Sequence, residues 1–365
     1  EKHNLALTAN SQVYSWGSNS YGQLGLSEKV DVPTRIKFMN AFTAWDIGAG
    51  VAHSVFLGDA TDMHPDVLFC GKHPSKDAHV SLKKINSATS LVDIKQLGWI
   101  TKVMAGGTMC ACKVLNPAPL ESEAVFELAA TERAFYNQLI KTSNVLLRPL
   151  QKSSFYTSMG VYPYKSLLRN MVAAFGALTK KIGEGITDLT KYIQNASPLN
   201  RSLLLGFHGQ FLEVFRTYSQ SFSDFVAVGG FDYCTRTGSE FFEKIQGSIR
   251  DLSEEKDKSV ASSSLFLRAM RYPFFRLVEY SRITTKIAAM TTIPEIKNQL
   301  QSLVLDWDGL KNKLTSEHKT ADATRLFWDA AYPKLAESLR IPDRRLLRES
   351  KTHPLHMPSG GRFTS

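Results

Sequence analysis

The chain contains 365 residues, of which 43% are hydrophobic, and 44 Lys and Arg against 34 Asp and Glu give it a net charge of +10. The length predicts two or three domains, and the apolar fraction excludes a wholly disordered chain. The sequence has no apolar run of the roughly 18 residues that a membrane span needs, and its four cysteines are too few for a disulfide framework. We therefore expect a cytoplasmic protein in a reducing compartment, with a charge that favours acidic partners or an anionic membrane.

Residues 1–116 are mostly short β-rich runs separated by glycine, asparagine and proline, which favour turns. Val13–Gly17 is echoed by Val67–Gly71, 54 positions later, and Ile47–Leu57 is echoed by Val103–Lys113 at an offset of 56. Self-similarity near 50 residues is typical of propeller blades built from four short strands. The sequence predicts a partial all-β propeller of about two blades.

The first copy of this repeat carries a distinctive set of residues. Tyr14–Gly17 is followed by Tyr21–Gly25 and then by Ala49–Ser54, which includes a Gly and a His-Ser pair. These residues resemble a repeat of the regulator of chromosome condensation, whose complete propellers have about seven blades. The resemblance implies that further blades are needed to close the ring and to cover its strand edges.

The same segment contains residue types that can serve chemistry elsewhere. His53 is expected to be a hydrogen-bonded turn or core histidine. Cys110 and Cys112 lie on an apolar run without a second pair at metal spacing, which favours core thiols over a metal site. Gly48 and Gly50 precede a predicted strand rather than a helix, which argues against a phosphate-binding loop.

Helical periodicity begins after residue 117 and continues to about residue 320. Apolar residues recur there at spacings of three, four and seven, which predicts an all-α bundle. Gly229 and Gly230 are expected to end one of its helices, and Pro273 to bend or interrupt another. The predicted helices span residues 120–151, 203–226, 262–290 and 294–314.

Two stretches of the predicted bundle carry a second resemblance. Phe126–Tyr136 contains the pair Thr131-Glu132, and Arg268–Leu277 contains an Arg-x-x-Arg-Tyr-Pro sequence. These stretches resemble the Dbl homology (DH) domain, the catalytic module of exchange factors for Rho-family GTPases. We therefore divide the chain into repeats (1–116), a DH domain (117–320), and a third segment (321–365).

The third segment, residues 321–365, is basic. It is similar to the linker and first strand of the pleckstrin-homology domain in alsin-type exchange factors, with Arg344–Ser350 as that strand. Because the chain begins at Glu1 rather than at Met, we expect a window of a longer protein. Residues 340–351 carry five cations and two acids, which predicts that Arg344, Arg345 and Arg348 contact anionic lipid headgroups; a solvated strand face is an equal alternative.

The DH resemblance implies a guanine-nucleotide exchange factor for Rho/Rac GTPases: a GTPase regulator without covalent chemistry, and so not an enzyme. No catalytic residue, cofactor or metal is expected. The GTPase-binding residues implied are Glu132, Arg268, Asp308 and Lys311. Glu132 is alternatively a solvated helix charge, and Arg268 a cation within the bundle. Asp308 replaces the family's asparagine and lacks its donor.

Other implications rest on the domain order of alsin-type proteins. These are endosomal trafficking and cytoskeletal signalling, a peripheral position on endosomal membranes, and a Rab GTPase as a partner of regions outside this chain. Homo-oligomers are also possible, and nucleic acid is disfavoured because the cations are dispersed. The alternative function is a non-catalytic interaction scaffold, since Ser264-Leu265 replaces the family's lysine-proline pair. Exchange on Ran by the repeats is a third possibility, for which two blades are few.

Overall fold

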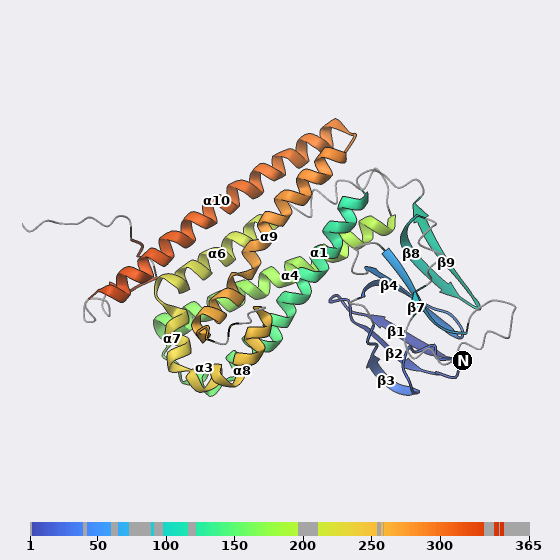
Figure 1. Ribbon diagram of the computed structural model, residues 1–365, viewed down its shortest axis with the longest axis horizontal. Helices are drawn as coiled ribbons and strands as arrows, with labels where there is room; N and C mark the ends of the chain where they lie inside the picture. Colours follow the sequence, from blue (N-terminus) through green and yellow to red (C-terminus); the bar gives the residue numbers. More distant parts are fainter. Residues whose placement is uncertain are drawn as a thin grey trace, which may run out of the picture.

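The computed structural model describes residues 2–38, 42–59, 65–72, 89–90, 98–115, 122–195, 211–253, 257, 259–331, 339–342 and 344–346. A β-rich part is followed by an elongated helical part, and the two lie side by side (Figure 1). No helix in these described ranges is both long enough and apolar enough to cross a membrane.

The described residues of the β-rich part form three antiparallel sheets with the orders β1-β2-β3, β4-β5-β6-β7 and β8-β9. The middle sheet has the four strands of one blade, and the other two are partial. This arrangement confirms the predicted partial propeller. The strands are β1 (His3–Leu7), β2 (Val13–Gly17), β3 (Val30–Arg35), β4 (Thr43–Ala49), β5 (His53–Asp59), β6 (Pro65–Gly71), β7 (Thr89–Ser90), β8 (Trp99–Gly106) and β9 (Met109–Leu115).

The repeat is visible in the backbone of the first two sheets. Gly17 ends β2 with φ 107° and pairs with His3, while Gly71 ends β6 with φ 105° and pairs with His53. A Cβ at Gly17 would lie 2.6 Å from the carbonyl oxygen of Lys2, so a side chain is excluded there by contact as well as by φ. Equivalent glycines therefore occupy equivalent corners of two blades.

The prediction that Cys110 and Cys112 are core thiols is wrong. Cys110 is exposed and Cys112 is half-buried at the edge of the core, because β9 is paired only with β8 among the described strands. Cys70, by contrast, is buried in β6, and burial raises the pKa of its thiol to about 12. His53 is buried and stacks on Phe69, in agreement with a core histidine. Among the residues that the structure describes, no three His, Cys, Asp or Glu side chains gather as metal ligands would.

The helical part is built around three long helices, α4, α9 and α10 (Figure 1). α1 packs against α4 and α9, and α6 packs against α4 and α10. The helices are α1 (Ser122–Thr142), the π-helix η2 (Ser143–Leu147), α2 (Arg148–Lys152), α3 (Ser154–Ser158), the π-helix η3 (Val161–Lys165), α4 (Ser166–Asn195), α6 (Phe211–Ala227), α7 (Gly230–Thr237), α8 (Ser239–Leu252), α9 (Ser262–Met290) and α10 (Pro294–Ala330).

Several helix bounds differ from the predictions. The single helix expected over 120–151 is divided into α1, η2 and α2, and α10 continues 16 residues beyond the predicted end at Leu314. α9 has the predicted bounds, but Pro273 lies inside it without ending it. Residues 203–210 of the predicted second helix lie outside the described residues, while α6 ends before Gly229, which has the expected positive φ of 69°. The 30-residue α4 was not predicted.

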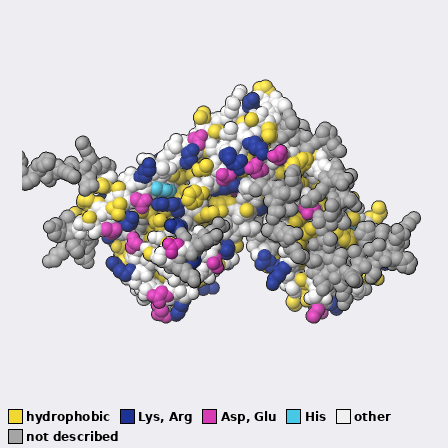
Figure 2. Space-filling view, viewed as in Figure 1, with side chains coloured by type: hydrophobic (Ala, Val, Ile, Leu, Met, Phe, Trp, Pro, Cys, Tyr) yellow, Lys and Arg dark blue, Asp and Glu magenta, His cyan; other side chains and the backbone are white. Residues whose placement is uncertain are grey.

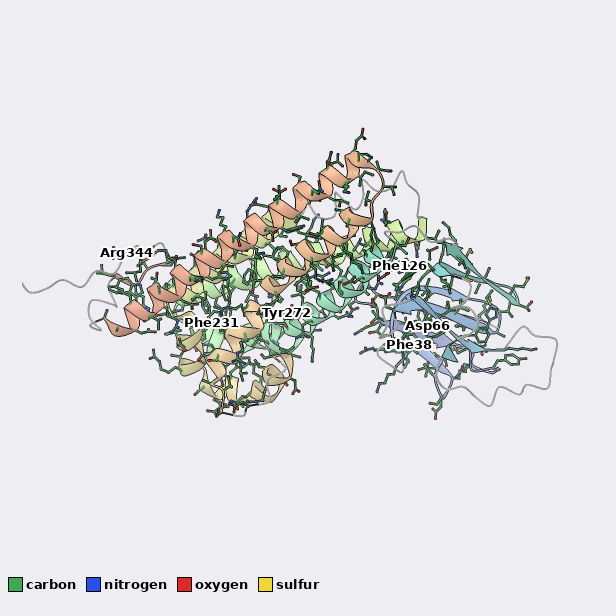
Figure 3. The ribbon with its side chains drawn as sticks, turned by 45° about the horizontal axis from the view of Figure 1, so that its top comes forward. Phe38, Asp66, Phe126, Phe231, Tyr272 and Arg344 are labelled. Carbon is green, nitrogen blue, oxygen red and sulfur yellow. The ribbon has the colours of Figure 1, made fainter. Side chains whose placement is uncertain are left out.

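One hydrophobic core extends through both parts of the molecule. Trp45, on β4, and Trp99, on β8, contact Phe126 of α1, with ring centroids 6.3 and 4.7 Å apart. Phe126 lies where the helices meet the sheets (Figure 3). Beside these rings, Arg133 of α1 donates from Nε to Oδ2 of Asp59 at 2.7 Å, and both side chains are buried. The repeats are therefore packed against the first helix of the bundle.

Candidate functional site

The acidic residue of the Thr-Glu pair lies inside the bundle. Glu132 is fully buried on α1, where its Oε2 accepts from Nε of Arg276 at 2.9 Å and its Oε1 accepts from the hydroxyl of Tyr280 at 2.7 Å. The Arg276 Nη2 group also donates to the hydroxyl of Thr131 at 3.0 Å. Both carboxylate oxygens are thus occupied by α9.

This position differs from the one expected for a GTPase contact or for a solvated helix charge. Glu132 shares its helix face with Leu128, Phe135 and Leu139, four residues before and three and seven after it, and all three are buried. Burial raises the pKa of Glu132, opposed by the attraction of the Arg276 guanidinium. Glu132 therefore joins α1 to α9, and its carboxylate is covered in this structure.

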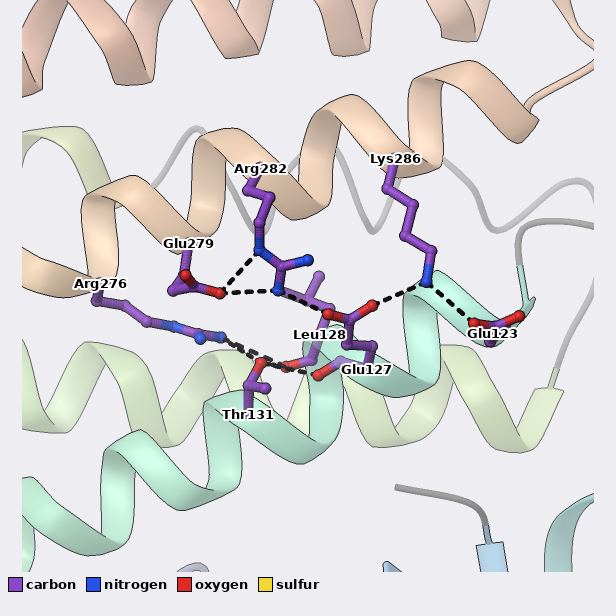
Figure 4. Close-up of polar contacts among 8 residues, drawn as sticks. All are labelled: Glu123, Glu127, Leu128, Thr131, Arg276, Glu279, Arg282 and Lys286. Atoms are coloured by element: carbon purple, nitrogen blue, oxygen red, sulfur yellow. Dashed lines mark hydrogen bonds and ion pairs between the residues drawn. The ribbon is translucent and has the colours of Figure 1, made fainter. Parts of the chain in front are cut away.

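A different acid of α1 reaches the surface. Glu127 accepts from Nη2 of Arg282 at 2.6 Å and from Nζ of Lys286 at 3.0 Å, both on α9 (Figure 4). Lys286 also contacts Glu123 at 3.0 Å, and Arg282 contacts Glu279 at 2.8 Å. Despite partial burial, the hydrogen bonds from Arg282 and Lys286 lower the pKa of Glu127. Glu127 thus stays ionised in a network of alternating charges.

Between this network and α10, α9 presents an outward stripe. Phe275 is 64% exposed and Val278 is 50% exposed, although both lie on a helix whose opposite face is packed. Arg268 and Arg282 lie seven residues before Phe275 and seven after it, and both are exposed. The spacings of three, four and seven place the four side chains on one side of α9.

The other edge of this stripe belongs to α10. Asp308 accepts from the hydroxyl of Ser281, on α9, at 3.1 Å and from Nζ of Lys311 at 2.8 Å. The hydrogen bond from Lys311 lowers the pKa of Asp308. Asp308 is therefore an ionised carboxylate that can accept hydrogen bonds but cannot donate them. This agrees with the expectation from the sequence, where an aspartate replaces the asparagine of the family.

We call this surface the α9 face. Three of the four sequence-predicted GTPase-binding residues lie on it, whereas Glu132 does not. Sequence reasoning missed the other four residues, although the helical spacing of the two exposed apolar residues could have shown the stripe on α9. Over the bundle, Figure 2 shows hydrophobic patches among Lys, Arg, Asp and Glu side chains. The α9 face consists of Glu127 on α1, Arg268, Phe275, Val278 and Arg282 on α9, and Asp308 and Lys311 on α10.

The predicted lipid-binding arginines are not equivalent. Arg344 is exposed, beyond the C-terminal end of α10 (Figure 3). Arg345 instead forms an ion pair with Asp224 of α6, and the amide of Leu346 donates to Oγ1 of Thr324 at 2.9 Å. Residues 344–346 thus lie against the bundle and are not in a strand, while Arg348 and the rest of the predicted strand lie outside the described residues.

Comparisons with known proteins agree with this organisation. The family model for the DH domain of alsin matches residues 144–328, and the model for the regulator of chromosome condensation (RCC1) repeat matches residues 10–57. Alsin from mouse is 32% identical over 99% of this chain, and human alsin 31% identical over 99%. The chain spans 22% of the length of these two proteins.

Shorter and more distant similarities also occur. The human probable E3 ubiquitin-protein ligase HERC6 is 43% identical over 58 residues, covering 15% of this chain and 6% of that protein. A crystal structure of the linker-DH/PH domains of p115-RhoGEF has a TM-score of 0.42 and 13% identity, covering 56% of this chain and 58% of that one.

The sheets, the bundle and the matched family models together define a protein in which an RCC1 repeat precedes a DH domain. The DH-domain match covers half of the chain. The chain belongs to the alsin DH-domain family.

Proposed function

We propose that this chain is a guanine-nucleotide exchange factor that binds a Rho/Rac-family GTPase on the α9 face. Membership of the alsin DH-domain family supports the class of reaction. The exposed pair Phe275 and Val278 supports the location, because an apolar centre with a charged rim is the usual composition of a protein interface.

Exchange requires only that the GTPase be held more tightly when its nucleotide has been loosened. Each tenfold acceleration corresponds to about 1.4 kcal/mol of preferential binding to that state. On this face Phe275 and Val278 would supply the apolar contact, while Glu127 and Lys311 would pair with polar groups of the GTPase. Such a regulator needs neither a cofactor nor a nucleophile of its own.

Release of fluorescent GDP from Rac tests the proposal, with the full chain added at increasing concentration. We expect acceleration that saturates, and a decrease of at least about tenfold with Glu127→Ala, since hydrogen bonds to charged groups contribute about 1.5–3 kcal/mol. Glu243→Ala is the matched control, because Glu243 is an exposed helix acid of α8 outside the α9 face. Failure of the full chain to accelerate release at any concentration would refute exchange activity.

A non-catalytic scaffold is the second candidate. It is favoured by Asp308, whose oxygen is already engaged by Ser281 and Lys311 and which offers no donor where the family has an amide. A scaffold would retain nucleotide-free Rac in a pull-down and would leave GDP release unchanged. Exchange activity predicts both retention and release, so the two assays together separate the candidates.

We also propose a cytoplasmic location at endosomal membranes, where the protein would act in trafficking and cytoskeletal signalling. Relationship to alsin supports these points, as it supports a Rab GTPase as a partner of regions outside this chain. Of the three predicted lipid-binding arginines, Arg344 is the one that the structure describes as exposed. Co-localisation of the full-length protein with endosomal markers tests the location, and cross-linking tests for a homo-oligomer.

A further inference from the structure

A groove separates the first sheet of the repeats from the end of α1 and the π-helix η2. Its volume is about 810 Å³, which is in the range of small-molecule sites. One wall comes from the β1–β2 turn and the segments after β3, and the other from residues 137–145. Figure 2 shows the hollow between the two parts of the molecule, with Lys and Arg side chains on its rim. None of the lining residues belongs to the α9 face.

The charges that line this groove have one sign. Arg35 and Lys37 contribute from the sheet side and Lys141 from α1, and all three are exposed. None of these three cations forms an ion pair within the described part of the chain, and none of the described lining residues is Asp or Glu. Unpaired cations on two facing walls raise the local positive potential and attract anions.

Two neutral polar side chains of the lining, Gln12 and Asn144, offer donors rather than acceptors. The Oδ1 atom of Asn144 accepts from Nη1 of Arg148 at 2.8 Å, and the Oε1 atom of Gln12 accepts from the hydroxyl of Tyr14 at 3.0 Å. Because a guanidinium can only donate, the Asn144 oxygen is fixed and its NH2 group is left for another acceptor. The groove therefore suits a ligand rich in anionic oxygen.

The backbone around the groove is unusual on both walls. Ser11 has φ 60°, the one positive φ of a non-glycine residue among those that the structure describes. Opposite it, Asn144 and Val145 belong to η2. Strained backbone and π-helical turns both concentrate at ligand sites.

We propose that this groove binds a compact polyphosphorylated polyol of the inositol polyphosphate kind, either free or as a lipid headgroup. Its phosphates would meet Arg35, Lys37 and Lys141, and its remaining oxygens would accept from the carboxamide NH2 groups. An acidic peptide would bring backbone N–H groups as well as carboxylates, and the engaged oxygens of Gln12 and Asn144 do not supply acceptors for them.

Titration calorimetry of the full chain with inositol hexakisphosphate at fixed ionic strength tests the proposal. We expect one site, and a loss of affinity of at least about a hundredfold in Arg35→Glu/Lys141→Glu, or about tenfold for each charge-assisted contact. The control Lys180→Glu/Lys319→Glu changes the net charge equally at exposed sites outside the groove and should bind like the parent. Asn137→Trp fills the groove without a change of charge and should also weaken binding.

The unliganded thermal midpoint of each variant verifies its folding. Phosphatidylcholine vesicles with and without phosphatidylinositol bisphosphate identify the source. Preferential binding to the phosphorylated vesicles indicates a headgroup, and binding to the free compound alone indicates a soluble ligand. The proposal is overturned if hexakisphosphate binds no more tightly than sulfate. Equal weakening by the groove pair and by the control pair, or unchanged binding in the groove pair and in Asn137→Trp, would also overturn it.

Discussion

At the scale of single residues, His318 on α10 illustrates how the aromatic core controls a charge. Its Nε2 atom lies 3.1 Å from the hydroxyl of Ser219, and its ring packs edge-on against Phe274 at 4.5 Å. Burial, reinforced by the nearby charge of Arg271, lowers the pKa of His318 to about 4, and Asp322 opposes this shift only partly. The histidine is therefore neutral in the folded protein.

We predict that His318 makes folding stability sensitive to acid. Because its folded pKa is about 4 and its unfolded value about 6.5, the unfolded state takes up a proton first as the pH falls. The contribution of His318 to the free energy of unfolding is complete above pH 6.5. It is lost as the pH falls towards 4, by up to about 3 kcal/mol. Urea unfolding of the parent and of His318→Gln at several pH values checks this, and equal slopes in both proteins would contradict it.

The buried pair of Glu132 and Arg276 provides a second prediction at this scale. Glu132→Gln keeps a partner for Tyr280 but leaves the Arg276 charge uncompensated inside the bundle, which should cost about 3–5 kcal/mol of unfolding free energy. Glu127→Gln, at the partly exposed network, should cost less than about 1 kcal/mol. If urea unfolding gives similar losses for the two variants, Glu132 is not the structural residue described above.

The residue types that carry these contacts could be recognised in the sequence, but their environment could not. The Thr131-Glu132 pair indicated the right helix, and Glu132 interrupts an apolar stripe, which is consistent with its burial. Its partner Arg276 lies 144 positions away on α9. Only the packing of α1 against α9 shows that Glu132 is enclosed and that Glu127 reaches the surface.

At the scale of elements, α9 remains continuous at Pro273, and a neighbouring helix contacts the turn that precedes the proline. Proline lacks an N–H and disturbs the hydrogen bonds of the preceding turn. The carbonyl that loses its helical N–H partner is that of Ala269, four residues before Pro273. The carbonyl oxygen of the next residue, Met270, accepts from the hydroxyl of Tyr218, on α6, at 2.5 Å. The phenylalanine-rich helix α6 thus holds the turn of α9 that precedes Pro273 through this hydrogen bond.

We predict that Tyr218→Phe destabilises the protein by about 0.5–1.5 kcal/mol, since it removes a buried hydrogen bond that joins α6 to the turn of α9 before Pro273. Tyr156→Phe on α3, where the hydroxyl has no hydrogen bond among those described, is the matched control. Chemical unfolding measures both. A loss from Tyr218→Phe no larger than that of the control would mean that the helix tolerates Pro273 without this bond.

Elements with periodic apolar residues were the most predictable. α9 and the described part of α6 follow their stripes, whereas α4 was missed although Leu168, Met171, Phe175 and Leu178 repeat at helical spacing. The end of α10 was predicted too early, at Leu314. Beyond that residue the next buried positions are small or polar, Ala321 and Thr324, so the sequence shows no apolar stripe, and α10 packs against α6.

At the scale of the whole molecule, the repeats and the bundle share one core, so the bundle is not an independent unit in this structure. The Asp59–Arg133 pair and the cation–π contact of Arg133 with Trp45, at 5.4 Å, lie between them. The sequence indicated both domain types but not this junction, because no periodicity within residues 1–116 shows which strand end meets α1.

We predict that Asp59→Ala destabilises both parts together by about 3–5 kcal/mol, because Arg133 is left buried and unpaired. Asp31→Ala is the control, since Asp31 pairs with Lys29 at an exposed site and should change stability by less than about 1 kcal/mol. Thermal unfolding followed by far-ultraviolet and tryptophan signals checks this. Separate transitions, or a helical signal unaffected by Asp59→Ala, would show that the bundle is stable without the junction.

The most direct test of the central claim is the rate of GDP release from Rac with the full chain carrying Phe275→Asp, beside Leu326→Asp. Both side chains are exposed and apolar, at 64% and 58%, but only Phe275 lies on the α9 face. We predict that Phe275→Asp lowers the exchange rate at least about tenfold, as expected for loss of an interface anchor, while Leu326→Asp keeps the parent rate. Exchange by Phe275→Asp at the parent rate would contradict the assignment of the α9 face.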